Sequence, residues 1–410
     1  MKKLLILGGG SSQLSAVRRA KELGCYTIVA DYLAQPPAAA LADRHVRVST
    51  FDVPGCLAVA QETGADGVLT LGTDQPLYTA AVISETLGLP FPLTAAAAQN
   101  ATDKQRMKAV FQAAGLPNTR HAFLQRGQGP EVLAGLKPPL VLKPVDSQGQ
   151  RGIFKLDSAE AAVARLEETL AFSRRDTALV EEYYPNEEIT VNGWVAEGRL
   201  QILAVTDRLS LASPNALGVC YGHRYPSKHL ALYEQIRDLS QDITAAFSVR
   251  EGPAYYQLLY GAKGLLVNEI AFRLGGAYED VIIPRISGFS TVDGVLAQAL
   301  GQKPDLSPLA GYDASQGDYA GLVQLMFCSS GRIGAITPLP RLLALPGVLA
   351  AGYNYRVGDL IPETLNATAR FGYCVMLGRA DQRQALNRAF WQAFQVRDEA
   401  GQELAQEYFI

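Results

Sequence analysis

Short apolar runs alternate with amphipathic stretches along the N-terminal part of this chain. An apolar run at residues 3–7 is followed by a glycine-rich turn at 8–12, and residues 13–23 have the periodicity of a helix. A second apolar run at 26–30 ends in an aspartate, and a further αβ unit ends at 67–76. This order predicts βαβ units built on a parallel sheet.

The rest of the chain mixes helical and β-rich segments. A helix is predicted at 103–114, where Gly115 and Pro117 stop it. Two β-rich runs within 255–276 surround a Gly-Ala-Lys-Gly turn and are typical of a hairpin. The later predicted elements are a helix at 292–300, a linker at 304–312, β-rich runs at 320–327 and 371–377, and a final helix at 383–394.

Asp74 follows the last apolar run of the N-terminal pattern, in the sequence Leu-Gly-Thr-Asp-Gln-Pro. Because the carboxyl ends of parallel strands face the ligand crevice in such folds, Asp74 is a candidate substrate-site residue. Asp is also a preferred N-cap residue, so capping of the next helix is an equal alternative. The turn at 8–12 could bind an anion, but its glycines lack the Gly-x-Gly-x-x-Gly spacing of dinucleotide sites.

The segment 141–153 carries a lysine from an apolar strand directly into a glycine loop. Lys143 would bring a positive charge to a polyphosphate, and Gly149 and Gly152 would let backbone N–H groups approach phosphate oxygens without a Cβ in the way. The order differs from a Walker A sequence, because the lysine precedes the glycines. A surface turn with a solvated lysine is the alternative for this segment taken by itself.

An apolar strand within 178–190 runs into acidic residues before a second strand begins. A linker at 181–184 could offer adenine one acceptor for its amine and one backbone donor for its ring nitrogen. The Glu188 carboxylate could then accept hydrogen bonds from ribose hydroxyls. A hairpin with solvated glutamates is the alternative.

The predicted hairpin at 255–276 would bring Gln257 and Glu269 close together across its two strands. Glu269 offers the oxygen ligand that Mg²⁺ prefers when nucleotide phosphates complete its coordination. Arg273 follows in the same segment and could stabilise charge on a transferring phosphoryl group. An edge hairpin with ordinary surface charges is the alternative.

Residues 208–226 contain Gly and Pro and have little periodicity, which predicts a long loop of the kind that often carries function. His223 and Arg224 within it could hold a substrate carboxylate or phosphate, since a guanidinium suits bidentate contact. An exposed basic turn would have the same sequence. In the C-terminal region, Arg356 and Arg370 are basic, and the sequence does not separate a substrate clamp from a surface charge there.

In order and spacing, these segments resemble the ATP-grasp superfamily, and the resemblance covers most of the chain. It implies α/β and α+β architecture, with an N-terminal Rossmann-like pre-ATP-grasp domain at 1–100, an ATP-grasp domain of two lobes at 101–302 and a C-terminal β-rich lid domain at 303–410. ATP would lie between the lobes, and a carboxylate would be activated as an acyl phosphate that an amine attacks. Mg²⁺ or Mn²⁺ would accompany the nucleotide. The sequence does not separate a homodimer, which is common among relatives, from other oligomeric states.

The resemblance also implies roles for individual residues. Lys104 and Lys143 match the two phosphate lysines of the family, and Glu269 matches the principal metal carboxylate. Arg273 matches the arginine beside the γ-phosphate and the acyl phosphate, so Arg273 and Lys143 are the expected catalytic residues. The further nucleotide contacts implied are Ser147, Gly149 and Gly152 of the mobile glycine loop, Glu181, Tyr183 and Tyr184 of the adenine linker, with both tyrosines acting through their backbone, and Glu188 at the ribose.

Two residues depart from the family pattern. Gln257 stands where most members have a glutamate as a second metal ligand, and Ala271 replaces an asparagine ligand. Fewer anionic ligands would make Mg²⁺ depend more on Glu269 and on the ATP phosphates. The chain is therefore predicted to have a weakened second metal site.

The branch of the superfamily stays open. The sequence Asn-Glu-Ile-Ala-x-Arg resembles carboxyaminoimidazole ribonucleotide synthases, whereas the Leu-Gly-Gly after it is more like amino-acid ligases and phosphoribosylglycinamide synthetase. The C-terminal region resembles those of amino-acid ligases and biotin carboxylase-like proteins. A carboxylate–amine ligase is the main expectation. A bicarbonate-using enzyme of the first kind and a nucleotide-binding protein with weakened catalysis are the alternatives.

Composition narrows the expected partners to small molecules. The chain has 410 residues, 19% of them charged, and a net charge of −3, which gives neither the basic footprint of a nucleic-acid-binding protein nor a polybasic membrane anchor. The N-terminal apolar run is short and lacks a signal-peptide cleavage pattern. Five scattered cysteines without a Cys-x-x-Cys pair indicate reduced thiols. These features predict a cytoplasmic enzyme that acts on a carboxylate and an amine.

Overall fold

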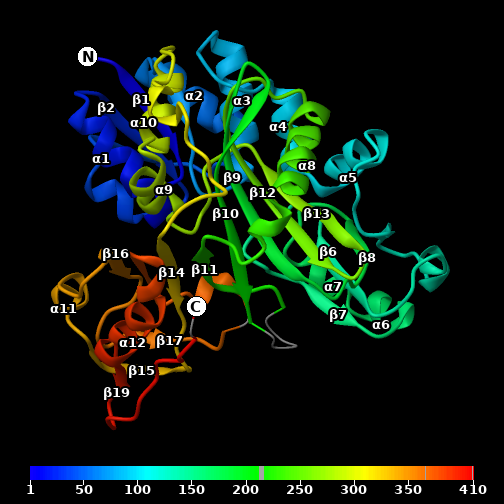
Figure 1. The fold of residues 1–410 in the computed structure, drawn as a ribbon. Coiled ribbons are helices and arrows are strands. Elements are labelled where there is room, and N and C mark those ends of the chain that lie inside the picture. The colour runs from blue at the N-terminus through cyan, green and yellow to red at the C-terminus, as the bar shows by residue number, and fades with distance from the viewer. Residues whose placement is uncertain (212–216, 365, 409) are drawn as a thin grey trace.

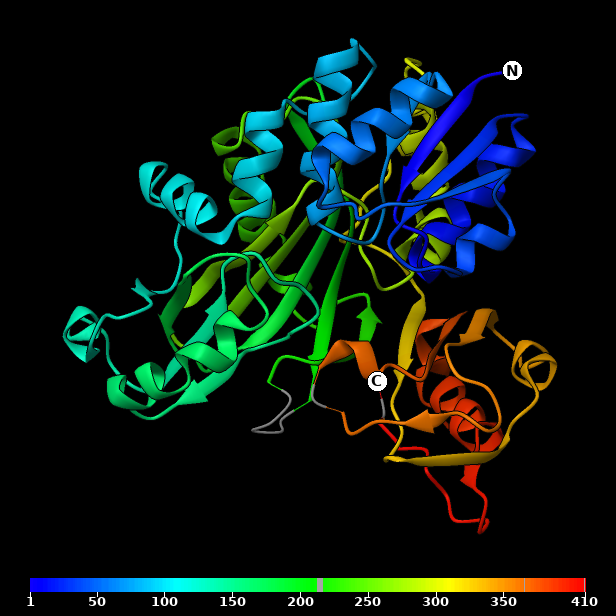
Figure 2. The same cartoon turned by 180° about the vertical axis from the view of Figure 1, so that it is seen from behind.

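Four β-sheets with helices packed around them make up the described part of the chain (Figure 1). The computed structural model describes residues 1–211, 217–364, 366–408 and 410. Figures 1 and 2 show a long central sheet, with the N-terminal sheet and the C-terminal region on one side of it and a smaller sheet on the other. This mixed architecture confirms the predicted α/β and α+β fold class.

The N-terminal region folds around a four-stranded parallel sheet in the order β3-β2-β1-β4. Alternate residues of β1 point to opposite faces, so Leu4 and Ile6 pack with α1 and with α10 (Thr291–Ala299), while Leu5 and Leu7 pack with α2 and α3. The predicted βαβ unit is confirmed. The elements of the N-terminal region are β1 (Lys3–Leu7), α1 (Leu14–Glu22), β2 (Tyr26–Asp31), β3 (Arg44–Arg47), α2 (Val53–Thr63), β4 (Gly67–Leu69), α3 (Gln75–Leu87) and α4 (Ala95–Thr102).

A smaller antiparallel sheet in the order β5-β8-β6-β7 forms the second lobe. Apolar side chains from its strands and from α6 and α7 make a separate core that includes Leu140, Leu142 and Val180. Helix α5 precedes this sheet, and its Asp103 caps it by accepting from the N–H groups of Gln105 and Arg106. The bounds are α5 (Lys104–Ala113), β5 (His121–Gln125), β6 (Leu140–Pro144), β7 (Phe154–Leu156), α6 (Ala159–Ala164), α7 (Leu166–Leu170) and β8 (Thr177–Glu182).

The central sheet has eight strands in the order β13-β12-β9-β10-β11-β14-β18-β16, and neighbouring strands are antiparallel. The hairpin predicted at 255–276 is confirmed as β12 and β13. Strands from both sides of the predicted domain boundary at 302 share this sheet, and α10 packs on the N-terminal sheet. The bounds are β9 (Glu187–Ala196), β10 (Arg199–Ser210), β11 (Cys220–Tyr225), α8 (Tyr233–Ala246), β12 (Gly252–Gly261), β13 (Gly264–Ala271), α9 (Glu279–Ser287), α10 (Thr291–Ala299), β14 (Ala320–Met326), β16 (Val348–Tyr353) and β18 (Gly372–Gly378).

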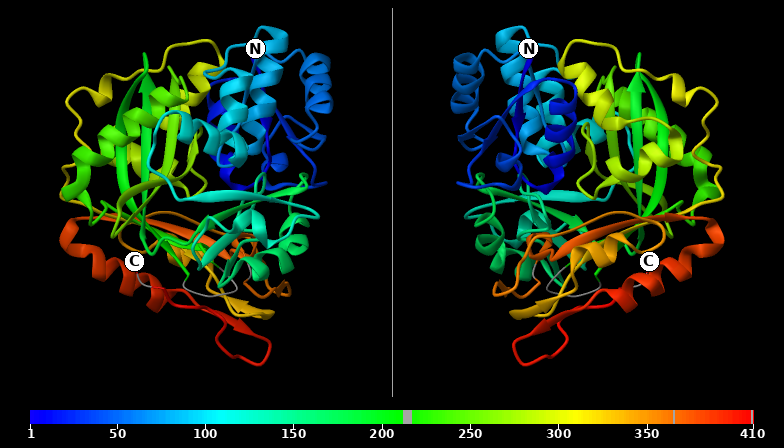
Figure 3. Two further views of the ribbon diagram at one scale, coloured as in Figure 1. Left: turned by 90° about the vertical axis from the view of Figure 1, so that its right-hand side faces the viewer. Right: turned by 90° about the vertical axis from the view of Figure 1, so that its left-hand side faces the viewer.

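The C-terminal region adds a three-stranded sheet in the order β17-β15-β19 and the predicted last helix (Figure 3). Phe390 and Phe394 of this helical segment pack against Phe371 and Met376 beside the central sheet. The bounds are β15 (Gly331–Ile336), α11 (Leu339–Leu343), β17 (Leu360–Ile361), α12 (Arg383–Ala393) and β19 (Val396–Asp398). Short 3₁₀ turns are η1 (Ser11–Gln13), η2 (Pro37–Ala40), η3 (Pro130–Leu133), η4 (Leu230–Leu232), η5 (Ser307–Leu309), η6 (Ala367–Ala369) and η7 (Ala380–Gln382).

The prediction of a long loop at 208–226 is wrong where two strands enter this segment. Residues 208–210 end β10, and residues 220–225 form β11, which pairs with β10. Part of the predicted loop, 212–216, lies outside the described residues. Several buried positions of these strands carry polar side chains that have polar partners, as His223 has in Thr206. These polar residues interrupt the apolar periodicity by which a strand is recognised in a sequence.

Two other features bear on the predicted class of protein. Cys25, Cys56, Cys220, Cys328 and Cys374 are buried free thiols, as the cysteine pattern predicts. Across the described ranges, none of the helices has the length and apolar character needed to cross a membrane.

Candidate active site

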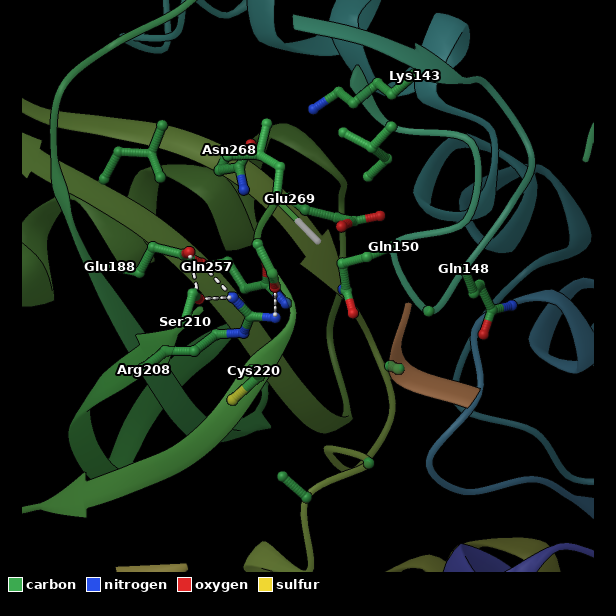
Figure 4. Close-up of a pocket in the computed structure, with 18 of the residues that line it drawn as sticks. Lys143, Gln148, Gln150, Glu188, Arg208, Ser210, Cys220, Gln257, Asn268 and Glu269 are labelled. Carbon is green, nitrogen blue, oxygen red and sulfur yellow. Dashed lines mark hydrogen bonds and ion pairs between the residues drawn. The ribbon is translucent and has the colours of Figure 1, made fainter. Parts of the chain in front are cut away.

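A cavity of about 580 Å³ lies where the smaller sheet, the central sheet and the C-terminal region meet. Figure 4 shows Lys143, Gln148 and Gln150 on one side and Glu188, Gln257 and Glu269 of the central sheet on the other. All the predicted site residues line it except Gly152. The lining set is Asp74, Lys104, Lys143, Ser147, Gly149, Glu181, Tyr183, Tyr184, Glu188, His223, Arg224, Gln257, Glu269 and Arg273.

Lys143 lies near the end of β6, is only 8% exposed, and contacts the Glu181 carboxylate on the neighbouring strand. A second lysine, Lys108 of α5, is 2.6 Å from Glu181 Oε1, which also accepts from the Thr119 hydroxyl. Burial raises the pKa of Glu181, but Lys108 and Lys143 outweigh burial and the net pKa is lowered. An adenine amine bound at Glu181 would therefore share an ionised carboxylate that already holds two lysines.

Two hydrogen bonds hold the glycine loop, one at its base and one at its tip. Gly149 and Gly152 have φ of +70° and +67°, a region that favours glycine. The Gly152 carbonyl accepts from the Thr169 hydroxyl at 3.0 Å, and a Cβ on Gly152 would lie 2.8 Å from the Phe172 side chain. The Ala367 N–H donates to the Gly149 carbonyl at 3.0 Å. Gly152 thus anchors the base of the loop, while Gly149 joins its tip to the C-terminal region.

Lys104, in the first turn of α5, also contacts this loop. Its ammonium donates to the Ser147 carbonyl at 3.2 Å and lies 2.9 Å from Glu269 Oε1. Burial lowers the pKa of Lys104, but the Glu269 carboxylate outweighs burial and the net pKa is raised. Lys104 therefore carries its charge into the cavity between the two lobes.

The linker after β8 is fixed by its tyrosines. The Tyr183 N–H donates to the Pro139 carbonyl at 2.8 Å, so this N–H is not free to contact adenine as predicted. The Tyr183 ring instead lies 3.6 Å from the Lys155 ammonium. The Tyr184 hydroxyl donates to the Gly264 carbonyl at 2.9 Å, which ties the linker to the β12–β13 turn. Any backbone contribution of Tyr183 to nucleotide binding is thus limited to its carbonyl.

Glu188, the second residue of β9, lies beside a basic partner that the sequence does not reveal. Arg208 Nη1 is 2.5 Å from Glu188 Oε2, and the Ser210 hydroxyl donates to Oε1 at 2.8 Å (Figure 4). Arg208 also donates to the Gly218 carbonyl at 2.9 Å. A ribose bound here would share the Glu188 carboxylate with Arg208 and Ser210.

Glu269 lies opposite Gln257 in the register of the hairpin, as predicted. Burial raises the pKa of Glu269, but Lys104 and Lys143 outweigh burial and the net pKa is lowered, so the carboxylate is ionised. The register shifts after Gln257, which leaves Asn268 as an extra residue of β13 beside Glu269. Both Asn268 and Glu269 line the cavity (Figure 4).

These donors fit a Mg²⁺ ion that also binds nucleotide phosphates. Glu269 supplies a carboxylate, and Gln257 and Asn268 carry amide oxygens, which are hard donors. Within the described ranges, no group of three or more His, Cys, Asp or Glu side chains is placed to hold a metal. The remaining ligands would come from ATP phosphates and water.

Arg273 follows β13 and reaches Asp74 at the start of α3. Its Nε donates to Asp74 Oδ1 at 2.7 Å, and both side chains are largely buried. Asp74 occupies the N-cap position of α3 but makes no capping hydrogen bond with its side chain. The alternative that Asp74 caps the helix is therefore wrong, and its carboxylate instead joins the N-terminal region to Arg273.

His223 and Arg224 lie on strand β11 rather than on a loop. His223 is 1% exposed, and its Nδ1 lies 3.2 Å from the Thr206 hydroxyl. Burial and two nearby arginines lower the pKa of His223 to about 3, so its imidazole is neutral. Arg224 Nε donates to Asp207 Oδ2 at 2.8 Å. An anionic substrate would therefore compete with Asp207 for Arg224 and would find no charge on His223.

Sequence patterns do not single out several residues that the fold brings to the cavity or its wall. Lys108 follows Lys104 by four positions, and this helical spacing was the available signal that both face the same side. Arg370 lines the cavity, whereas Arg356 is exposed outside it. The missed residues are Lys108, Thr119, Arg208, Ser210 and Asn268.

Known families and proteins are similar to this chain in sequence. Residues 136–279 match the family described as ATP-grasp domain. The chain is 23% identical over 287 residues to the L-arginine-specific L-amino acid ligase of Bacillus subtilis, which covers 67% of each chain. It is 22% identical over 245 residues to dapdiamide A synthase of Enterobacter agglomerans, covering 58% of this chain and 57% of that relative.

Among solved structures, the fold is similar to that of an L-amino acid ligase from Bacillus licheniformis. The TM-score is 0.80 at 19% sequence identity, and the match covers 97% of this chain and 99% of the other. The likeness therefore extends over all three regions of the fold. The matched family, the sequence relatives and the fold agree: residues 136–279 form an ATP-grasp domain, and the chain has the ATP-grasp fold over nearly its full length.

Proposed function

We propose that this protein is an ATP-dependent ligase that activates a carboxylate as an acyl phosphate and joins it to an amine. The observation that carries the proposal is the convergence of Lys104, Lys143, Glu269 and Arg273 on one cavity from separate segments of the chain. Phosphoryl transfer requires positive charge that binds the phosphates, a carboxylate that binds a metal, and a guanidinium that contacts the transferring group.

ATP would lie between the smaller sheet and the central sheet. Lys104 and Lys143 would contact its phosphates, and the linker at Tyr184 and the Glu188 carboxylate would flank the adenosine. Bound Mg²⁺, held by Glu269 with the amide oxygens beside it, would neutralise and align the β- and γ-phosphates. The glycine loop would cover the phosphates with backbone N–H groups.

The chemistry consists of two displacements. A carboxylate oxygen attacks the γ-phosphorus, the bond from that phosphorus to the β–γ bridging oxygen breaks, and ADP leaves. The amine then attacks the acyl carbon, the C–O bond to phosphate breaks, and the nitrogen loses a proton as the amide forms. Arg273 and Lys143, which both line the cavity, would neutralise charge that develops on the phosphoryl oxygens. No side-chain nucleophile is required, since alignment and charge neutralisation supply the rate enhancement.

A second candidate function rests on a short sequence. The run from Asn268 to Ala271, followed by a residue and Arg273, resembles carboxyaminoimidazole ribonucleotide synthases. In such an enzyme bicarbonate would be the activated acid and the amine would belong to a ribonucleotide. The same cavity residues would serve that reaction, so the acceptor must be identified by experiment.

The test is phosphate release from MgATP by the purified protein, measured against separate pools of amino acids, other carboxylates, amines and bicarbonate. Glu269→Ala is the blank, and Arg356→Ala, at an exposed arginine outside the cavity, is the matched control. We expect phosphate release that requires both a carboxylate and an amine. This release should persist in the control and disappear in the blank. Release that requires bicarbonate and an aminated ribonucleotide would support the second candidate. ATP binding without release in any pool would contradict both.

A further inference from the structure

Arg370 is a half-buried cation on the C-terminal wall of the cavity without a carboxylate partner among the described residues. The other lining cations outside the glycine loop are neutralised by acidic residues. Those pairs are Lys104 with Glu269, Lys143 with Glu181, Arg208 with Glu188, Arg224 with Asp207, Lys228 with Glu187, and Arg273 with Asp74.

The hydrogen-bonding capacity of Arg370 is also incompletely used. Its Nη1 makes a long contact of 3.4 Å to the Gly276 carbonyl, and the guanidinium also contacts the uncharged Tyr278 hydroxyl. Its Nε is buried and has no hydrogen-bond partner in the described structure. A guanidinium that is partly removed from water without a counter-charge is costly, and an oxyanion from a ligand would supply what is missing. The guanidinium fork suits two-point contact with a carboxylate or phosphate.

The segment around Arg370 is firmly positioned. Ala369 before it and Phe371 after it are buried, and the Phe371 N–H donates to the Met326 carbonyl at 2.8 Å. Ala367, in the turn that leads to Arg370, donates to Gly149 of the glycine loop. The glycine loop and the turn that leads to Arg370 are therefore in direct contact.

Arg370 is also close to the residues proposed for phosphoryl transfer. His223 in the same cavity is neutral, so it does not repel a cationic amine or hold an anion by itself. Arg370 contacts the carbonyl of Gly276, three positions after Arg273. A molecule held by Arg370 would thus have its reactive end near the phosphoryl-transfer residues.

We propose that Arg370 binds an oxyanion of the amine substrate, a carboxylate or phosphate group that is separate from the reacting amine. This inference rests on the proposed function, and it narrows the nucleophile to an amino acid or a phosphorylated amine. Arg273 serves the reacting acyl group, while Arg370 recognises the group that does not react. Neutral amines of the same shape would then be poor substrates.

The first test measures KM and kcat for the amine, the carboxylate and ATP in wild type, Arg370→Gln, Arg370→Lys and the Arg356→Ala control. Loss of charge-assisted contacts should raise the KM of the amine about 10- to 100-fold in Arg370→Gln. The KM for ATP and the kcat at saturating amine should change little, and Arg370→Lys should recover part of the loss. An unchanged amine KM in Arg370→Gln would overturn the proposal, as would equal use of amino acids and their amides by wild type.

The second test does not depend on turnover, so it separates this inference from the proposed function. The Arg370 Nε–H signal of protein labelled with ¹⁵N-arginine is assigned by its absence in Arg370→Lys. It is then followed during titration with a pool of amino acids, the matching pool of amino-acid amides, and O-phosphoethanolamine. A saturable shift with the amino acids alone identifies a carboxylate, and one with O-phosphoethanolamine identifies a phosphate. No shift with either anion, or an equal shift with the amides, would refute the proposal even if ligation is observed.

Discussion

Replacement of Asp74 by asparagine tests how Arg273 is held for phosphoryl transfer. Asp74 Oδ1 accepts from Arg273 Nε at 2.7 Å, and the two side chains are only 18% and 9% exposed. The asparagine side chain would keep the shape of the aspartate but remove the negative charge that orients the guanidinium. Within the described residues, Asp74 makes no ion pair or hydrogen bond with the side chains of Lys104, Lys143 or Glu269, although its charge contributes to the raised pKa of Lys104.

The magnitude follows from the kind of contact that is weakened. A hydrogen bond that involves a charged group contributes about 1.5–3 kcal/mol. If that energy is lost only where Arg273 contacts the transferring group, kcat falls by about 10- to 150-fold, because each 1.36 kcal/mol corresponds to a factor of ten in rate. The KM for ATP should stay within about a factor of three, since uniform binding is unaffected.

The assay is steady-state phosphate release by wild type, Asp74→Asn, Arg273→Ala and the double variant, with thermal unfolding as the check on folding. Because Asp74 acts through Arg273, the double variant should be no slower than Arg273→Ala alone. Multiplicative losses in the double variant would show that Asp74 acts independently, for example on the substrate. Unchanged kcat in Asp74→Asn would refute the reasoning outright.

Three further predictions concern the nucleotide and metal contacts. Lys143→Ala should raise the KM for ATP about 10- to 100-fold and lower kcat, because a charge-assisted phosphate contact is lost, whereas the exposed Lys137→Ala should match wild type in the same assay. Glu181→Gln should lower the free energy of unfolding by about 3–5 kcal/mol in urea titrations, since it leaves Lys108 buried without its carboxylate. The pKa of Glu181 is lower in the folded protein than in the unfolded chain, so the Glu181 carboxylate stabilises the fold fully above the unfolded pKa of about 4.3. This stabilisation is lost as pH falls from about 4.3 toward the folded pKa, and the Gln variant should therefore lose less stability in acid than wild type. Gln257→Glu should lower the Mg²⁺ concentration needed for half-maximal activity and tighten Mn²⁺ binding measured by electron paramagnetic resonance. If both values are unchanged, the hypothesis of a weakened second metal site is wrong.

The elements that carry the site could be predicted from the sequence because each has a strong local signal. Lys143 stands at the junction of an apolar strand and a glycine loop, and Gln257 and Glu269 are set opposite each other by a short turn. Both patterns depend on neighbours close in the chain, so periodicity and turn chemistry are sufficient to find them.

The remaining features depend on long-range contacts or on irregular strands. The pair between Asp74 and Arg273 joins positions 199 residues apart, and the sequence alone favours helix capping at Asp74 equally. Asn268 reaches the cavity through a register shift that no local pattern predicts. Arg370 is indistinguishable from a surface charge until β18 is placed in the central sheet.

The most direct measurement follows oxygen from the carboxylate into phosphate. Pools of amino acids and other carboxylates labelled with ¹⁸O in the carboxyl group are incubated with MgATP, unlabelled amines and the protein, and the released phosphate and nucleotides are analysed by mass spectrometry. An acyl phosphate formed at Arg273 and Lys143 predicts ADP, and one ¹⁸O in each phosphate released from a labelled acid that is ligated. Unlabelled phosphate accompanying product formed from a labelled acid, or AMP in place of ADP, would contradict the account.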